Sequence, residues 1–210
     1  MTVIALFGAT GKTGQRVQAK ALAEGHSVRA LVRDPGKVQV THERLQVIQG
    51  DVLDAKAVAQ TVAGADVVLA LFGHVKGSQP TLQTDGTRAI VAAMQASGVT
   101  RLVTLSGGGL RAPQDRPKLA DRVMRTLLRL MAGAVLADAE GHLVVLQQSG
   151  VDWTVVRGPM LTEDPGKGRY RVGWVGVGTG MRISRDDLAD FILTQVADRT
   201  FVGQLPFVSE

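Results

Sequence analysis

The chain contains no cysteine and few aromatic residues among its 210 residues. Without cysteine it can form no disulfide, no thiolate metal site and no cysteine nucleophile. One Tyr, two Trp and five Phe are few for a surface that stacks nucleic-acid bases, which argues against nucleic acid as a partner. The four histidines are scattered without the spacing of metal ligands, so we expect no metal site.

Long apolar runs are also missing. No stretch of 18 apolar residues occurs, and no basic segment precedes an apolar signal core at the N-terminus. We therefore expect a cytoplasmic protein without a membrane partner. The net charge of +5 is modest and suits an anionic cofactor without requiring a nucleic acid. A chain of this length can bury the core of one domain without disulfides.

Glycines at positions 8, 11 and 14 directly follow the apolar run of residues 2–7. That run is typical of a buried parallel strand, and residues 14–24 have a helical pattern. In a strand–turn–helix unit, the first glycine permits the tight turn and the second lets the backbone approach a pyrophosphate. The third lets the helix pack close to the sheet, with its N-terminal N–H groups directed at the anion. The sequence therefore predicts a dinucleotide site.

The end of the second expected strand, residues 27–32, bears on the choice of cofactor. Sites selective for NAD usually place a carboxylate there, where it accepts a hydrogen bond from the ribose 2′-OH. Here the position is occupied by Val32 or Arg33, and a guanidinium suits a 2′-phosphate. Lys12 adds a positive charge nearby. We expect NADP(H), although Asp34, one residue later, keeps the NAD alternative open.

Strands and helices alternate along the rest of the chain. This alternation predicts an α/β fold with a Rossmann-type, doubly wound parallel sheet in a single domain over residues 1–210. Its substrate-side part is expected at about residues 157–184. Further strands are expected at residues 45–49, 65–71, 101–106 and 153–157, and further helices at 54–62, 79–97, 118–135 and 185–196. Ligands of such sheets bind beyond the carboxyl ends of the strands.

Six motifs in order resemble one family. They are Gly8-Ala9-Thr10-Gly11-Lys12-Thr13-Gly14, Leu31-Val32-Arg33-Asp34, Gly50-Asp51-Val52, Asp85-Gly86-Thr87-Arg88, residues 149–157 and residues 183–189. Together they resemble the atypical short-chain dehydrogenase/reductases, in particular the flavin reductase/biliverdin reductase B and NmrA-like group.

The resemblance implies a role for each motif. Thr10, Gly11, Lys12, Thr13 and Gly14 would wrap the pyrophosphate, with Gly8 opening the turn. Arg33 would bind the 2′-phosphate, Asp51 and Val52 would border the adenine, and Phe72, Gly73 and Ser106 would line the route to the nicotinamide.

The catalytic residues depart from the family pattern. Ordinary short-chain dehydrogenases use a tyrosine and a lysine four residues later, whereas Tyr170 is followed at that spacing by Trp174. We expect Ser106 and His142 to be the polar catalytic candidates, with His74 as a further loop histidine. Hydride transfer to a flavin or quinone depends less on a dedicated acid, because stacking and positioning contribute much of the catalysis.

Three other features have an open role. Arg157 could bind an acidic substrate or a cofactor phosphate, or form an ion pair with Glu163 or Asp164. Asp186 and Asp187 are expected to cap the last helix. The helix expected at residues 118–135 is amphipathic and carries a basic face, typical of a solvated helix, an oligomer contact or a flap over the cleft.

Three functions follow. The first is an NADPH-dependent reductase of a flavin, quinone or similar planar acceptor. The second is an NmrA-like sensor that binds NADP(H) and a protein partner without catalysis. The third is an epimerase or lyase, for which a chain of this length leaves little room for a substrate domain.

Overall fold

The computed structural model describes residues 1–210, apart from the surroundings of the Ala120 and Leu128 side chains. At its centre is an eight-stranded sheet with the order β3-β2-β1-β4-β5-β6-β10-β8. The strands are β1 Val3–Phe7, β2 Ser27–Val32, β3 Leu45–Gln49, β4 Val67–Ala70, β5 Arg101–Gly107, β6 Asp152–Gly158, β8 Arg171–Gly173 and β10 Phe207–Ser209. All pair in parallel except β8, which is antiparallel to β10. The expected doubly wound, Rossmann-type sheet is confirmed.

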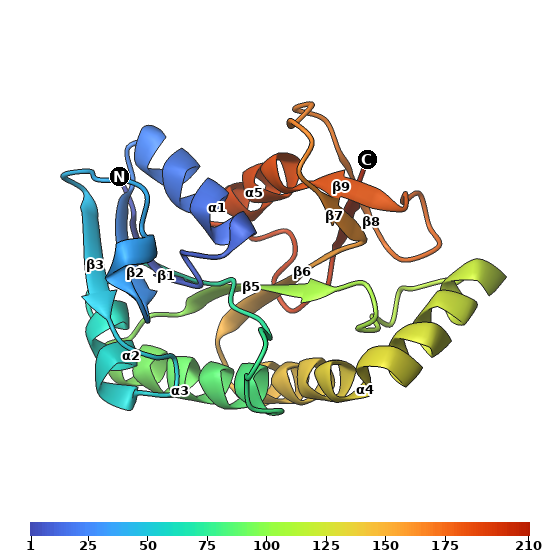
Figure 1. Ribbon diagram of the computed structural model, residues 1–210, viewed down its shortest axis with the longest axis horizontal. Helices are drawn as coiled ribbons and strands as arrows, with labels where there is room; N and C mark the ends of the chain where they lie inside the picture. Colours follow the sequence, from blue (N-terminus) through green and yellow to red (C-terminus); the bar gives the residue numbers. More distant parts are fainter.

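Helices cover both faces of the sheet (Figure 1). On one face lie α1 Lys12–Ala23 and α5 Arg185–Thr194, and on the other lie α2 Ala55–Val62, α3 Leu82–Ser97 and α4 Leu119–Gln148. The side chains of β1 alternate between the two layers, as the twofold period of a strand requires. Ile4 and Leu6 join the core beneath α1 and α5, whereas Ala5 and Phe7 join the core beneath α2, α3 and α4.

The strand order reverses direction at β1, which pairs with β2 on one side and with β4 on the other. In doubly wound sheets this switch point leaves a crevice beyond the carboxyl ends of the strands, and ligands bind there. The glycine turn after β1 and the segment after β4 therefore meet at one place.

The helices expected at residues 54–62 and 79–97 form as α2 and α3, and each has a residue that caps one end. The Asp54 carboxylate accepts hydrogen bonds from the backbone N–H groups of Lys56 (3.0 Å) and Ala57 (3.3 Å) at the start of α2. Gly98 ends α3 in the left-handed conformation, with φ of +70°. Such a conformation favours glycine because glycine has no Cβ.

The expectation for the cap of α5 was wrong. Ser184, rather than Asp186 or Asp187, caps this helix, because its hydroxyl accepts the N–H of Asp187 at 3.0 Å. The Asp187 carboxylate instead accepts the backbone N–H groups of Lys167 and Gly168, both at 2.9 Å. It therefore fastens the substrate-side segment to α5.

Helix α4 differs most from its expected form. It continues to Gln148 and is interrupted at Ala132, whose φ and ψ of −140° and 38° are not helical. Before this kink several apolar side chains face solvent, with exposed fractions of 78% for Leu119 and 82% for Leu130. The polar Arg125 turns inward instead and donates to the carbonyl of Gly109 at 3.1 Å.

The second part of α4 packs against α3 and the sheet. The segment Arg129–Gln148 is long and apolar enough to cross a membrane by length and composition alone. Its His142 and Leu146 are buried in the helix–sheet interface, as in a core helix of this fold.

The substrate-side segment contains two short strands that the sequence did not predict. β7 Met160–Thr162 and β9 Arg182–Ser184 form a separate parallel pair. β8 joins the main sheet through β10, so the end of the chain closes the sheet beside β6.

Candidate cofactor cleft

The glycine turn between β1 and α1 is closed by a hydrogen bond from the N–H of Gly11 to the carbonyl of Gly8 (3.0 Å). Gly8 has φ of +86°, and a Cβ there would lie 2.6 Å from the backbone nitrogen of Phe72. A Cβ at Gly14 would lie 2.1 Å from the Gly8 carbonyl oxygen. These contacts leave no room for side chains, so both positions need glycine for the backbone to fold this closely.

Gly11 is the N-cap of α1 and offers no capping side chain. The first N–H groups of the helix are therefore left to a ligand or to water, and a helix N-terminus attracts an anion. The glycine turn thus fits a pyrophosphate. Thr10, Lys12 and Thr13 belong to the same turn, with Lys12 exposed and Thr13 buried.

At the end of β2, Arg33 is exposed and has no hydrogen bond or ion pair to the described residues. The neighbouring Asp34 is engaged in a turn. Its carboxylate accepts the N–H of Gly36 at 3.0 Å and lies 3.7 Å from Lys37 Nζ. The carboxylate that could accept a ribose hydroxyl is thus tied to its own loop, whereas the guanidinium is free.

Val52 and Phe72 lie together at the carboxyl edge. A Cβ added to Gly86 of α3 would approach the Phe72 ring to 2.8 Å and Val52 Cγ1 to 3.1 Å. Gly86 therefore lets both side chains pack directly on α3. Asp51 accepts the N–H of Leu53 at 3.0 Å, and the neighbouring Gly73 is exposed.

Ser106 lies near the end of β5 and pairs in register with Arg157 of β6. Its side chain is only 9% exposed. The glycine turn, Val52, Phe72 and Ser106 thus come from the carboxyl ends of four strands, and the fold brings them to one edge of the sheet.

His142 lies outside this group. Its ring sits between Thr87 and Thr104, with Nδ1 2.8 Å from the Thr87 hydroxyl and Nε2 3.2 Å from the Thr104 hydroxyl. Burial lowers the pKa of His142 to about 4, and the charge of Asp138 counteracts only part of this effect. A neutral ring with both nitrogens engaged and 3% exposure argues against the expected role as an acid.

Arg157 is likewise not a ligand at the rim of the cleft, and neither expected ion pair forms. The side chain is fully buried and binds Asp115 through two bonds of 2.9 Å. It also donates to the carbonyls of Leu110 (2.7 Å) and Leu205 (2.8 Å). Asp115 in turn accepts the N–H of Val175 at 3.0 Å, so this pair joins the β5–α4 loop to the substrate-side segment.

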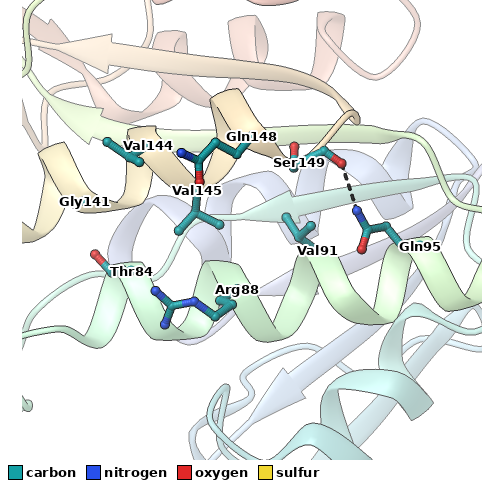
Figure 2. A pocket seen from close by; sticks show the side chains of 9 residues that line it. All are labelled: Thr84, Arg88, Val91, Gln95, Gly141, Val144, Val145, Gln148 and Ser149. Atoms are coloured by element: carbon teal, nitrogen blue, oxygen red, sulfur yellow. Dashed lines mark hydrogen bonds between the residues drawn. The ribbon is translucent and has the colours of Figure 1, made fainter.

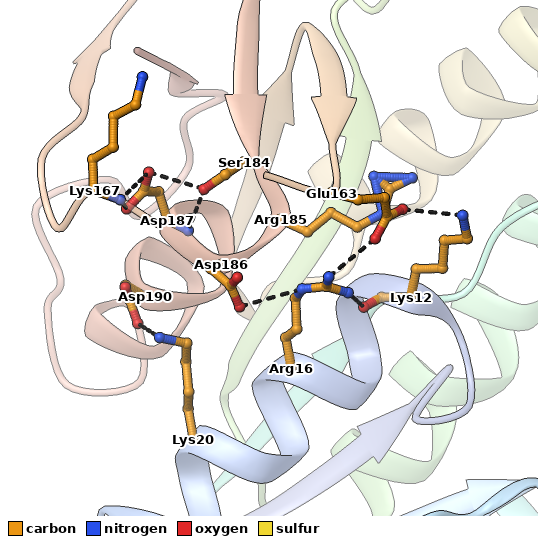
Figure 3. Close-up of polar contacts among 10 residues, drawn as sticks. All are labelled: Lys12, Arg16, Lys20, Glu163, Lys167, Ser184, Arg185, Asp186, Asp187 and Asp190. Carbon is orange, nitrogen blue, oxygen red and sulfur yellow. Dashed lines mark hydrogen bonds and ion pairs between the residues drawn. The ribbon is translucent and has the colours of Figure 1, made fainter. Parts of the chain in front are cut away.

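Glu163 instead faces the start of α1 (Figure 3). Its two carboxylate oxygens lie 3.0 Å from Lys12 Nζ and 3.0 Å from Arg16 of α1, and 3.4 Å separates it from Arg185 of α5. The hydrogen bond from Lys12 lowers the pKa of Glu163, together with the charges of Arg185, Lys12 and Arg16, and outweighs the opposing effect of burial. The substrate-side segment therefore reaches the helix end that would hold a pyrophosphate.

One histidine–carboxylate pair was not expected as a pair. His74, four residues after β4, lies with Nε2 2.7 Å from Asp138 of α4. The Asp138 carboxylate also accepts the N–H groups of Gln83 (2.7 Å) and Thr84 (2.9 Å) at the start of α3. No local pattern joins positions 74 and 138, so sequence reasoning could find His74 but not its partner.

A cavity of about 470 Å³ lies elsewhere, between α3 and α4 (Figure 2). Figure 2 shows Gln95 of α3 bonded to the Ser149 carbonyl at its end, at 2.9 Å. The cavity is lined by Thr84, Arg88, Val91, Gln95, Gly141, Val144, Val145, Gln148 and Ser149. None of the residues of the glycine turn borders it, so it is separate from the candidate cleft.

Known proteins share both the fold and the sequence pattern. The chain is 34% identical over 128 residues to a 3-diazoavenalumate denitrifying reductase of a Streptomyces species, covering 55% of this chain and 41% of that protein. A short-chain dehydrogenase/reductase of Veillonella parvula in complex with NADP superposes with a TM-score of 0.79 at 21% identity, covering 100% and 94% of the chains. The anaerobillin reductase ChuY of Escherichia coli O157:H7 gives 0.78 at 22% identity, covering 100% and 97%.

A model of the NAD(P)H-binding family matches residues 8–199, a span that starts at the first glycine of the turn and ends after α5. This match covers nearly the whole chain and includes the strand–turn–helix unit on which the dinucleotide prediction depends. The chain belongs to the NAD(P)H-binding family.

Proposed function

We propose that the protein is an NADPH-dependent reductase that transfers a hydride to a flavin, quinone or similar planar acceptor. The proposal depends on the Arg33 guanidinium at the end of β2, which has no partner among the described residues and lies beside a glycine turn that fits a pyrophosphate. A guanidinium binds a phosphate through paired hydrogen bonds. The NADP complex of the Veillonella relative supports the choice of cofactor.

In this proposal Thr10, Gly11, Lys12, Thr13 and Gly14 hold the pyrophosphate, and Arg33 holds the 2′-phosphate. A bound nicotinamide supplies the hydride. Lys12 is exposed, so it can move from Glu163 to the cofactor at little electrostatic cost, because exposed ion pairs contribute little.

The acceptor side is formed by the remaining cleft residues. Asp51 and Val52 border the adenine, and Phe72, Gly73 and Ser106 line the route to the nicotinamide. Residues 157–184 cover the acceptor, in a segment fastened by Asp115 and Asp187. The reductase names of the Streptomyces and E. coli relatives support a small-molecule acceptor.

The second candidate is an NADP(H) sensor without catalysis. Tyr170 favours it, since this single tyrosine of the chain packs edge-to-face on Phe191 of α5 at 5.8 Å. Burial together with the charges of Asp190 and Asp187 raises the pKa of Tyr170. A tyrosine so placed is a poor proton donor for a substrate.

Calorimetric titration with NADPH and NADH, followed by oxidation of the tighter cofactor in the presence of FMN or menadione, separates the two candidates. A reductase binds NADPH more tightly and consumes it with at least one acceptor. NADPH binding without consumption with any acceptor would support the sensor. Equal affinity for the two cofactors would refute the role of Arg33.

A further inference from the structure

We propose that His74, held by Asp138, is a catalytic residue that supplies the proton accompanying hydride transfer. This inference rests on the proposed reductase function and adds the acid that the missing tyrosine–lysine pair leaves unassigned. It starts from the contact of 2.7 Å between His74 Nε2 and Asp138 Oδ2.

Asp138 lies toward the carboxyl edge of the sheet. His142 of α4 contacts Thr104 of β5. Helix α4 leads from the end of β5 back to the start of β6, so it runs antiparallel to these two parallel strands. One helical turn from His142 to Asp138 covers about 6 Å toward the carboxyl edge. Two strand residues from Thr104 to Ser106 cover about 7 Å in the same direction on the same face. Asp138 and Ser106 therefore lie at the same level of the cleft.

The Asp138 carboxylate is buried and charged. The Asp138 side chain is 1% exposed. Burial by itself would raise its pKa, but hydrogen bonds from Thr84, Gln83 and His74 outweigh that effect and lower it. Asp138 is therefore an anion at neutral pH, and it accepts a hydrogen bond from the His74 ring.

The bond to Asp138 sets the orientation of the His74 ring. A carboxylate can only accept, so His74 Nε2 must carry the hydrogen of this bond. Nδ1 has no hydrogen bond within the part of the chain that the structure describes, and the side chain is 15% exposed. The arrangement fixes the ring by one nitrogen and leaves Nδ1 without a partner among the described residues, as where a carboxylate orients a catalytic histidine.

With a quinone as acceptor, the acceptor takes up two electrons and one proton as the hydride, and the second proton passes to an acceptor oxygen from Nδ1 of the doubly protonated His74 ring, which becomes neutral. NADPH is oxidised to NADP⁺ and the quinone is reduced to the hydroquinone. His74 then recovers its proton from water through its exposed side.

A structural role for the pair is the competing explanation, because Asp138 also caps α3. His74→Gln separates the two roles. Its amide can still donate to Asp138 but carries no transferable proton. His26→Gln is the matched control, since His26 also lies near a carboxylate, Glu24 at 3.7 Å, but at the opposite edge of the sheet, before β2.

The test compares two acceptors. Menadione requires hydride and proton, whereas the N-methylphenazinium cation becomes neutral on taking up the hydride alone. His74→Gln should lower kcat with menadione about 100-fold, leave kcat with N-methylphenazinium unchanged, and leave KM, calorimetric NADP⁺ affinity and thermal unfolding as in the wild type. His26→Gln should change none of these. Unchanged kcat with both acceptors, or an equal loss with both, would overturn the inference while the reductase function stands. A wild type that oxidises NADPH with neither acceptor would overturn the proposed function and the inference with it.

A readout independent of activity comes from long-range ¹H–¹⁵N spectra of the wild type. The His74 ring should have a protonated Nε2, and in its neutral form a bare Nδ1. A His74 ring protonated at Nδ1 with a bare Nε2 would contradict the bond to Asp138 and refute the proposal.

Discussion

The buried pair of Arg157 and Asp115 gives the sharpest stability prediction. Asp115→Asn removes the charge opposite a guanidinium that is fully buried and donates two hydrogen bonds of 2.9 Å to this carboxylate. The two backbone carbonyls that Arg157 also contacts carry no net charge to replace it. Breaking a buried pair by changing one partner costs about 3–5 kcal/mol, because an uncompensated charge stays buried. For a domain of this size that corresponds to a fall in Tm of roughly 10 °C.

Urea unfolding followed by circular dichroism measures this cost. The matched control is Lys20→Ala, which removes a half-exposed ion pair of 2.6 Å with Asp190 of α5 and should cost less than about 1 kcal/mol. The double variant Asp115→Asn/Arg157→Met removes both charges and should recover part of the loss. A loss below about 1 kcal/mol for Asp115→Asn would refute the reasoning, since it would mean that the guanidinium is solvated or re-paired.

Other expected outcomes test the turn, the cofactor and the buried histidine. Gly14→Ala should lower Tm and NADP⁺ affinity because its Cβ would lie 2.1 Å from the Gly8 carbonyl, whereas Gly133→Ala, in α4 with open space around it, should do neither. Arg33→Ala should weaken the binding of NADPH by about 1.5–3 kcal/mol, measured by calorimetry, and leave the binding of NADH unchanged. Equal losses of affinity for the two cofactors would contradict a 2′-phosphate contact. Because burial lowers the pKa of His142 to about 4 from 6.5, the unfolded chain binds more protons between these values. Stability should therefore fall by about 3 kcal/mol as pH drops through this window, and His142→Gln should remove that slope in urea titrations.

The parts of the fold that follow from local patterns were predictable from the sequence. The strand run ending at Phe7, the glycine turn and the N-cap at Asp54 each depend on residues close in the chain. Twofold alternation and capping chemistry act over a few residues, so they can be read without knowing the rest of the molecule. The parallel sheet follows from their order, because alternating units leave few topologies open.

The parts that depend on distant partners were not predictable. Arg157 has the same local context whether it faces a ligand or Asp115, which is 42 residues away. Strand β10 is only three residues long and is defined by its pairing with β6 and β8. The helix expected at residues 118–135 was identified as amphipathic with its role left open, and in the structure Leu119 and Leu130 are exposed while Arg125 turns inward. Tertiary contacts of the polar side chains, not hydrophobic period, orient that part of the helix.

The same division separates the cofactor site from the catalytic groups. Binding a pyrophosphate requires backbone N–H groups and the absence of side chains, and one stretch of seven residues, 8–14, provides both. Supplying a proton requires a side chain whose environment is built by other elements, and His142 and His74 show how much this matters. His142 lies one helical turn from Asp138, and His74 contacts Asp138 directly. The His142 ring is enclosed by two hydroxyls, whereas His74 keeps one nitrogen without a partner among the described residues. Residue type alone favoured neither histidine, and it is the surroundings of the ring that make His74 the candidate acid.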